Sequence, residues 1–170
     1  NLHLMGEPTL HPDLIEILNF AASKKVKTDL VTNGSTLVKK VVPKILETLY
    51  GTISASHMTP TKETYHFRGK VGLSWERYIG NLRLLVREYM KRVSKGCLIT
   101  NNITIRVMVS QNTASNVNIT ETENEAQAIL KEWNDFVAEV EQELAMPPFK
   151  RKDHYDDDLL RENKFSNTSY

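Results

Sequence analysis

Residues 26–56 read VKTDLVTNGSTLVKKVVPKILETLYGTISAS and contain one strand–helix–strand unit. The unit begins with a predicted strand, Val26–Val31, which stops at Thr32-Asn33-Gly34, a turn signal in which glycine is free to take a positive φ. Apolar side chains then recur at helical spacing over residues 38–49, and a second strand follows at Thr52–Ser56. This order is typical of two parallel strands joined by a crossover helix.

The same alternation extends in both directions along the chain. Upstream, Leu2–Met5 is a short strand, and a helix opens at His11-Pro12-Asp13, where proline suits the first turn. Downstream, residues 74–96 predict a long helix capped by its serine, and apolar residues alternate with polar ones over Ile103–Val109, as in a strand. A last helix is expected over Glu121–Leu144.

Two segments are expected to depart from this regular pattern. Pro43 would break a helix interior, so the helix after the first turn comes in two pieces or starts late, near Val42. His57–Leu73 lacks periodicity and predicts a long loop, with a short helix around Lys62–Phe67.

Four alternations of strand and helix predict an α/β fold with a parallel sheet and right-handed crossovers. A doubly wound open sheet and a β/α barrel both fit, and both bind ligands at the carboxyl ends of their strands. Short polar side chains at those ends suit a small polar ligand. The strand ends are Gly6-Glu7-Pro8, Thr32-Asn33-Gly34, Ser54 to His57 and Ser110-Gln111-Asn112.

The composition is that of a soluble protein of about one domain: 170 residues, with 22 Lys plus Arg against 21 Asp plus Glu. No apolar run reaches the roughly 20 residues of a membrane span. The single cysteine, Cys97, excludes an intramolecular disulfide and any all-cysteine metal site made by this chain alone. We interpret it as a structural residue and expect a reducing, cytoplasmic setting.

Charge is balanced overall but not locally. Residues 62–95 hold nine basic and three acidic residues, a net charge of +6, and residues 121–143 hold eight acids and one lysine, a net charge of −7. We interpret both as solvated faces of amphipathic helices rather than as a nucleic-acid site, because the aromatic residues of the basic stretch fall at core spacing.

Residues 4–14, LMGEPTLHPDL, resemble the second-strand motif of the radical S-adenosylmethionine enzymes, whose usual form is Gly-Gly-Glu-Pro. Thr32-Asn33-Gly34, then Ile53–Ser56 and Tyr65–Gly69 follow in the order of that superfamily, and the resemblance covers roughly residues 1–110. It implies a partial (β/α) barrel of the radical S-adenosylmethionine type with about four βα units.

The resemblance implies that the amino group of the S-adenosylmethionine methionyl moiety lies at Gly6, Glu7 and Pro8. An ammonium is well matched by a carboxylate and backbone carbonyls in a dry site. The alternative for Glu7 is that it caps the helix opening near Pro12. Asn33 is a candidate contact at the next strand end, although an asparagine there is more often a turn residue.

Further contacts with the cofactor are carried over position by position. Ser54 resembles the ribose-binding serine, with Ser56 as an alternate, although both could simply fill a tight interior. Arg68 resembles the arginine that holds the methionyl carboxylate, a natural bidentate partner, and is otherwise a solvated loop charge. The strand at Val107 to Val109 would lie along the adenine. Arg106 is either a ligand contact or half of a buried pair with a carboxylate such as Glu7 or Asp29.

The sequence departs from the family in two places. Met5 stands where the family has its first glycine, and the Cys-x-x-x-Cys-x-x-Cys loop that holds the [4Fe–4S] cluster is absent, since it belongs upstream of Asn1. We therefore expect a fragment of a radical S-adenosylmethionine enzyme, inactive alone, with a partial core at 1–146 and a polar tail or linker at 147–170. The family implies an electron donor such as flavodoxin or ferredoxin.

Two other functions fit an α/β domain. A metal-dependent barrel hydrolase could use His3, His11 and His57, which fall at or near strand ends, although no His-x-His spacing supports it. A non-catalytic nucleotide-binding domain is the other, although the chain has neither a Gly-x-x-x-x-Gly-Lys nor a Gly-x-Gly-x-x-Gly loop.

Overall fold

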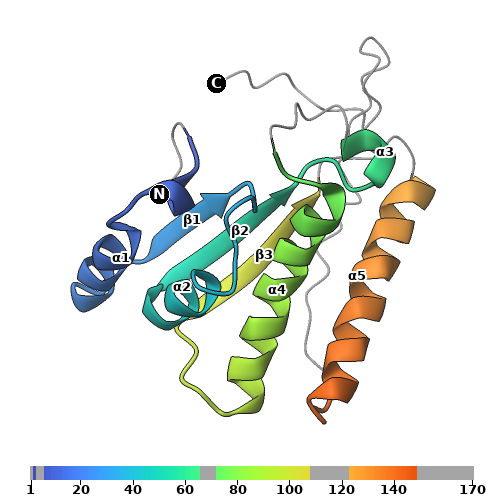
Figure 1. Cartoon of the computed structure of the whole chain (residues 1–170). Coiled ribbons are helices and arrows are strands. Elements are labelled where there is room, and N and C mark those ends of the chain that lie inside the picture. The colour runs from blue at the N-terminus through green and yellow to red at the C-terminus, as the bar shows by residue number, and fades with distance from the viewer. Residues whose placement is uncertain (1, 3–5, 66–71, 108–122, 149–170) are drawn as a thin grey trace.

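The computed structural model of the chain describes residues 2, 6–65, 72–107 and 123–148 (Figure 1). These residues form an α/β unit in which helices alternate with strands along the chain. In order, the elements are the 3₁₀ helix η1 (Pro8–Leu10), α1 (Leu14–Ser23), β1 (Thr28–Thr32), α2 (Val42–Thr48), β2 (Gly51–His57), α3 (Lys62–Tyr65), α4 (Trp75–Ser94), β3 (Asn101–Val107) and α5 (Glu123–Glu143).

The three strands form one open, parallel sheet in the order β1-β2-β3. Leu30, Ile53 and Ile103 are opposite one another in the register, so the three carboxyl ends meet at one edge. On the free side of β1, Leu2 forms a parallel bridge with Leu30, and its N–H donates to the Asp29 carbonyl at 2.8 Å. The expected strand Leu2–Met5 is thus represented by Leu2, since its other residues lie outside the described part of the chain.

The packed helices lie on one face of this sheet. Figure 1 shows α2 and α4 in front of the strands, with α1 beside α2 at the left, and α5 packs on α4 and on the β3 residues Ile103 and Ile105. The core therefore lies between this helix layer and the sheet face that carries Leu30, Ile53 and Ala55, all three fully buried.

The opposite sheet face is polar, because side chains alternate along each strand. From the register it carries Asp29 on β1, Ser54 and Ser56 on β2, and Thr104 and Arg106 on β3. Asp29, Thr104 and Arg106 are exposed to solvent.

The element boundaries confirm much of the expected pattern. Helix α2 starts late, at Val42, with Pro43 in its first turn, where a missing N–H costs no hydrogen bond. The short helix α3 lies inside the long loop, as expected. Strand β1 starts two residues later than expected, because the backbone at Lys25 takes a positive φ and Val26 is still exposed.

The basic and acidic stretches contact each other across α4 and α5. Arg83 pairs with Glu132 at 2.8 Å, and Arg87 pairs with Glu143 at 3.2 Å, with all four side chains about two-fifths to one-half exposed. These residues lie on the solvated helix faces that the sequence predicted. None of the described helices is long and apolar enough to cross a membrane.

Tyr89 makes the stability of the fold sensitive to alkaline pH. Its ring is buried and its hydroxyl donates to the Asn101 carbonyl at 3.3 Å. Burial raises the pKa of Tyr89 above its ordinary value of 10.0, because the phenolate is poorly solvated there. The neutral, buried Tyr89 contributes fully to the free energy of unfolding below its ordinary pKa of 10.0. As the pH rises above 10.0, the tyrosine of the unfolded chain ionises first, and this contribution is lost.

We therefore expect the urea midpoint of the wild-type chain to fall between about pH 9 and about pH 11, more steeply than that of Tyr89→Phe. Denaturation followed by circular dichroism across this range measures both slopes. Equal slopes in the two proteins would contradict the prediction.

Candidate functional site

The Glu7 carboxylate links the N-terminal segment to the end of β1. Oε1 accepts hydrogen bonds from the Thr9 N–H at 3.2 Å and from the Thr32 hydroxyl at 2.6 Å, and Oε2 accepts from the Asn33 N–H at 2.6 Å. The Thr9 contact caps η1, so the alternative function of Glu7 as a helix cap is present, at η1 rather than near Pro12. The carboxylate is therefore both a cap and a cross-link between segments 25 residues apart.

Threonine hydroxyls surround this carboxylate. The Thr9 hydroxyl also donates to Oε1 of Glu7 and contacts the Thr36 hydroxyl. Three of the four described donors point at Oε1 and one points at Oε2, so Oε2 accepts a single hydrogen bond among the described residues, whereas a carboxylate oxygen has about two acceptor sites. All four donors are neutral, so the negative charge of Glu7 is solvated by the protein without being neutralised by these contacts.

The Thr32-Asn33-Gly34 turn is built by its own side chains. The Asn33 Oδ1 accepts from the Ser35 N–H at 2.8 Å, and the Thr32 hydroxyl oxygen accepts from the Gly34 N–H at 3.1 Å. Asn33 is thus the turn residue that the sequence favoured, while its backbone N–H holds Glu7.

These groups surround a pocket of about 300 Å³ at the carboxyl edge of the sheet. Its lining joins segments that are far apart in the sequence. The lining residues are Gly6, Glu7, Val31, Thr32, Asn33, Ser56 and Met58. Four of the predicted site residues, Gly6, Glu7, Asn33 and Ser56, are therefore brought together, and Pro8 follows directly as the first residue of η1.

Sequence reasoning did not single out Val31 or Met58, and it named Thr32 only as part of the strand end Thr32-Asn33-Gly34, without a role in the site. Thr32 had a usable signal, because it ends a strand at the ligand-binding edge and its short hydroxyl side chain suits a buried hydrogen bond. Val31 and Met58 carry no polar signal and are found only from the fold.

The two serine candidates lie at different depths. Ser56 lines the pocket. Ser54 lies two residues further from the carboxyl edge, is 2% exposed and is not among the lining residues. In the register Ser54 faces Val31 and Thr104, and Ser56 faces Arg106. The geometry favours Ser56 as the contact with a bound molecule.

Of the two alternatives for Arg106, a ligand contact or half of a buried ion pair, the buried pair is wrong. Arg106 is exposed, and the described hydrogen bonds of Glu7 come from threonine hydroxyls and backbone N–H groups. The side chain lies on the polar sheet face, where solvent reaches it, so a buried carboxylate partner is not needed. Its register position opposite Ser56 places the base of this arginine beside the pocket.

Two other candidates are only partly covered by the structure. Val107 is the last residue of β3 and lies opposite His57 in the register; it does not line the pocket. Val109 and Arg68 lie outside the described residues.

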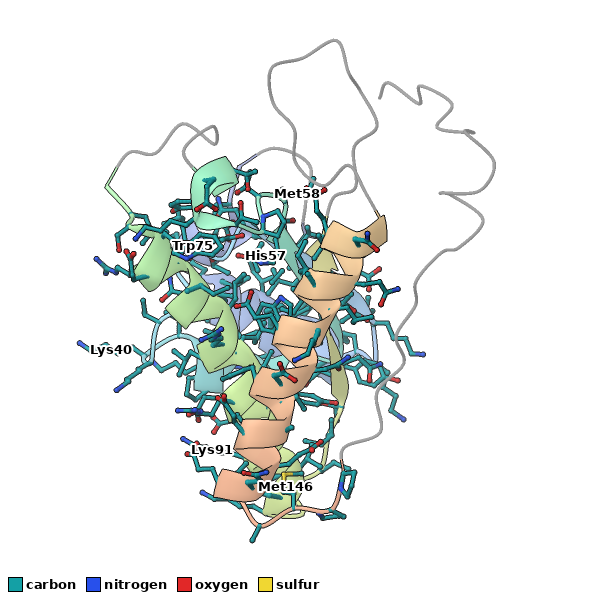
Figure 2. The ribbon with its side chains drawn as sticks, turned by 90° about the vertical axis from the view of Figure 1, so that its right-hand side faces the viewer. Lys40, His57, Met58, Trp75, Lys91 and Met146 are labelled. Carbon is teal, nitrogen blue, oxygen red and sulfur yellow. The ribbon has the colours of Figure 1, made fainter. Side chains whose placement is uncertain are left out.

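His57 points into the helix layer, on the opposite sheet face from Ser56. Its ring is 1% exposed, stacks on Trp75 at 6.1 Å and meets the edge of Trp133 at 5.7 Å, an arrangement visible in Figure 2 for His57 and Trp75. The Tyr78 hydroxyl lies 3.4 Å from His57 Nδ1 and donates to the Ser56 carbonyl at 2.8 Å. His57 is a core residue behind the pocket wall.

The histidines of the hydrolase alternative have separate surroundings. His11 is exposed, and its Nδ1 accepts from the Asp13 N–H at 3.1 Å, whereas His57 is buried beneath α4. His3 lies outside the described residues. Within the described ranges, no group of three His, Cys, Asp or Glu side chains could hold a metal ion.

Comparisons with protein-family models, with curated proteins and with solved structures found no significant match. The site itself consists of a carboxylate that accepts from hydroxyls and backbone N–H groups, with a serine and two apolar side chains across a small pocket. Such a lining suits a small molecule with a cationic end, hydroxyl groups and an apolar part.

Proposed function

We propose that this chain binds S-adenosylmethionine at the carboxyl-edge pocket, as part of a radical S-adenosylmethionine enzyme. The observation that carries the proposal is the convergence of three separate motifs on one pocket. Gly6-Glu7, the Thr32-Asn33 turn and Ser56 are far apart in the sequence and share one lining. The resemblance assigns Gly6 and Glu7 to the cofactor, and it gives Ser56 as the alternate to Ser54 for the ribose.

The strand order and the helix layer favour a partial barrel rather than a doubly wound sheet. Leu2, β1, β2 and β3 follow each other in chain order, and α1, α2, α4 and α5 pack on one face. A doubly wound sheet reverses its strand order and has helices on both faces, whereas a barrel has its helices outside. The polar second face then corresponds to a barrel interior.

The chemistry of the lining matches the parts of S-adenosylmethionine. Glu7 holds the methionyl ammonium at Oε2, because the four neutral donors do not neutralise the carboxylate and only one of them points at that oxygen. The Ser56 hydroxyl binds a ribose hydroxyl. Val31 and Met58 contact the apolar parts of the molecule.

The iron–sulfur cluster does not fit the residues of this chain. The cluster of this family needs three cysteine thiolates, and the chain has one cysteine, Cys97, at the carboxyl end of α4. The proposal for these 170 residues is therefore cofactor binding. Reductive cleavage needs cysteines that this chain does not contain and an electron donor such as flavodoxin or ferredoxin.

Titration calorimetry with S-adenosylmethionine tests the proposal. We expect one molecule bound per chain, with a dissociation constant in about the micromolar-to-millimolar range. Adenosine, which lacks the amino acid part, should bind at least about tenfold more weakly, because it has no ammonium for Glu7. A chain that binds neither compound, or binds both equally, would exclude the proposed function.

The two serines provide a matched control in the same titration. Ser56→Ala should weaken binding about threefold to tenfold, the effect of one lost hydrogen bond, while Ser54→Ala stays within about twofold. Equal effects would remove Ser56 from the site.

A further inference from the structure

Helix α4 is joined to the pocket by a buried asparagine. Asn81 is 7% exposed, and its Nδ2 donates to two carbonyls of the loop after β1, that of Gly34 at 3.0 Å and that of Ser35 at 3.1 Å. One side chain thus fixes two consecutive peptide groups of a loop that precedes it by 46 or more residues.

These peptide groups belong to the turn that holds Glu7. The Asn33 N–H donates to Glu7 Oε2 at 2.6 Å. The Gly34 N–H donates to the Thr32 hydroxyl oxygen, and that hydroxyl donates to Glu7 Oε1. Asn81 is therefore connected to the carboxylate through the turn, without contacting the pocket lining itself.

The turn also rests directly on α4. Gly34 has a φ of +79°, and a Cβ there would lie 2.7 Å from Cδ2 of Leu82, the residue after Asn81. One helical turn before Asn81, the Tyr78 hydroxyl donates to the Ser56 carbonyl. The first turns of α4 thus hold both strand ends that form walls of the pocket.

We propose that Asn81 is a positioning residue for the S-adenosylmethionine site. By holding the Gly34 and Ser35 carbonyls, it fixes the two peptide groups that follow Gly34 and Ser35, and so restricts the backbone rotations that would move the preceding Asn33 and Gly34 N–H groups and, with them, the Glu7 carboxylate. This inference rests on the proposed function. A small displacement of a charged group is enough to weaken an ionic contact in a site of this kind.

Asn101 is a matched control for the same chemistry at the other end of the sheet. It is 4% exposed, and its Nδ2 also donates to two carbonyls, those of Leu46 at 2.8 Å and Leu49 at 3.2 Å. As the first residue of β3, it lies at the amino edge of the sheet, away from the pocket. Asn101→Ala removes two comparable hydrogen bonds and leaves the turn intact.

The experiment compares Asn81→Ala with Asn101→Ala in the full chain, well below both thermal midpoints. We expect both variants to lose stability, because each leaves buried carbonyls without a donor. Only Asn81→Ala should speed amide hydrogen exchange at Asn33, Gly34 and Ser35, by at least about tenfold, since these N–H groups lose their fixed orientation. Its dissociation constant for S-adenosylmethionine should rise at least about tenfold, against about twofold or less for Asn101→Ala.

Each result decides between positioning and simple stabilisation. Equal rises in the dissociation constant for the two variants, or unchanged exchange at the turn in Asn81→Ala, would overturn the inference. A wild-type chain that binds no S-adenosylmethionine would overturn the proposed function. In that case the amide exchange rates of the two variants still show whether Asn81 orders the turn. If Asn81→Ala does not fold, Asn81→Ser and Asn101→Ser, which keep one hydroxyl donor each, replace the pair with the same expected contrast.

Discussion

Replacing Glu7 with alanine is expected to weaken S-adenosylmethionine binding by at least about a hundredfold. The variant removes the negative charge that we propose as the partner of the ammonium. It also leaves the hydroxyl of Thr32, which is 1% exposed, and the Asn33 N–H without their acceptor. Truncating one side of a close charge pair typically costs about 2–5 kcal/mol, and a hundredfold change corresponds to about 2.7 kcal/mol.

Glu7→Gln separates charge from shape in the same titration. The amide keeps the size of the side chain and one acceptor oxygen, but its NH₂ group faces a donor that formerly pointed at Oε2, the Asn33 N–H. We expect it to bind nearly as poorly as the alanine variant. Glu16→Ala, which removes an exposed carboxylate from α1, is the control and should stay within about twofold. Wild-type affinity in Glu7→Ala would remove this residue from the site.

Gly51→Ala is expected to cost at least about 4 kcal/mol of unfolding free energy, or to prevent folding. Gly51 opens β2, the central strand, with a φ of +145°, and a Cβ there would lie 2.2 Å from the Thr28 carbonyl oxygen and 2.6 Å from the Thr28 nitrogen. Both atoms are backbone atoms of the neighbouring strand, so relief would require the β1–β2 pairing to shift. The strained φ adds a further penalty for any side chain.

Gly80→Ala is the matched control for this substitution. Gly80 is exposed in α4, and a Cβ there would meet no atom within 4 Å beyond its chain neighbours and the helix's own backbone. An alanine in a helix is better than glycine by about 0.5–1 kcal/mol, so this variant should be more stable than the wild-type chain. Urea denaturation followed by circular dichroism gives both values. A Gly51→Ala chain within about 1 kcal/mol of the wild type would contradict the packing argument.

Local sequence patterns predicted the elements well where one physical signal dominated. The Ser74 cap and the apolar stripe of α4 predicted its start correctly, and the position of Pro43 predicted the late start of α2. The pattern extended β1 too far, to Val26, because the sequence does not distinguish an exposed apolar side chain from a buried one. It also suggested a buried partner for Arg106, which solvent reaches on the polar sheet face.

The candidate site was predictable in part. Gly6, Glu7, Asn33 and Ser56 were singled out as residues at strand ends, and they line one pocket because parallel strands share a carboxyl edge. The four donors on the Glu7 carboxylate, and the choice of Ser56 over Ser54, depend on distances between segments far apart in the chain. The spacing of residues along the chain does not determine those distances.

The sequence by itself determined the alternation of strands and helices, the parallel direction of the strands and the edge at which polar side chains gather, because these follow from periodicity, turn residues and chain connectivity. Only the tertiary structure decided the surroundings of Asn81, Asn101 and His57. Each is a polar residue in or beside a regular element, where local sequence predicts a solvated side chain. Each buried asparagine donates to two backbone carbonyls, and His57 packs among aromatic rings. A buried polar group needs a hydrogen-bond partner, and the tertiary packing determines which groups lie close enough to be that partner.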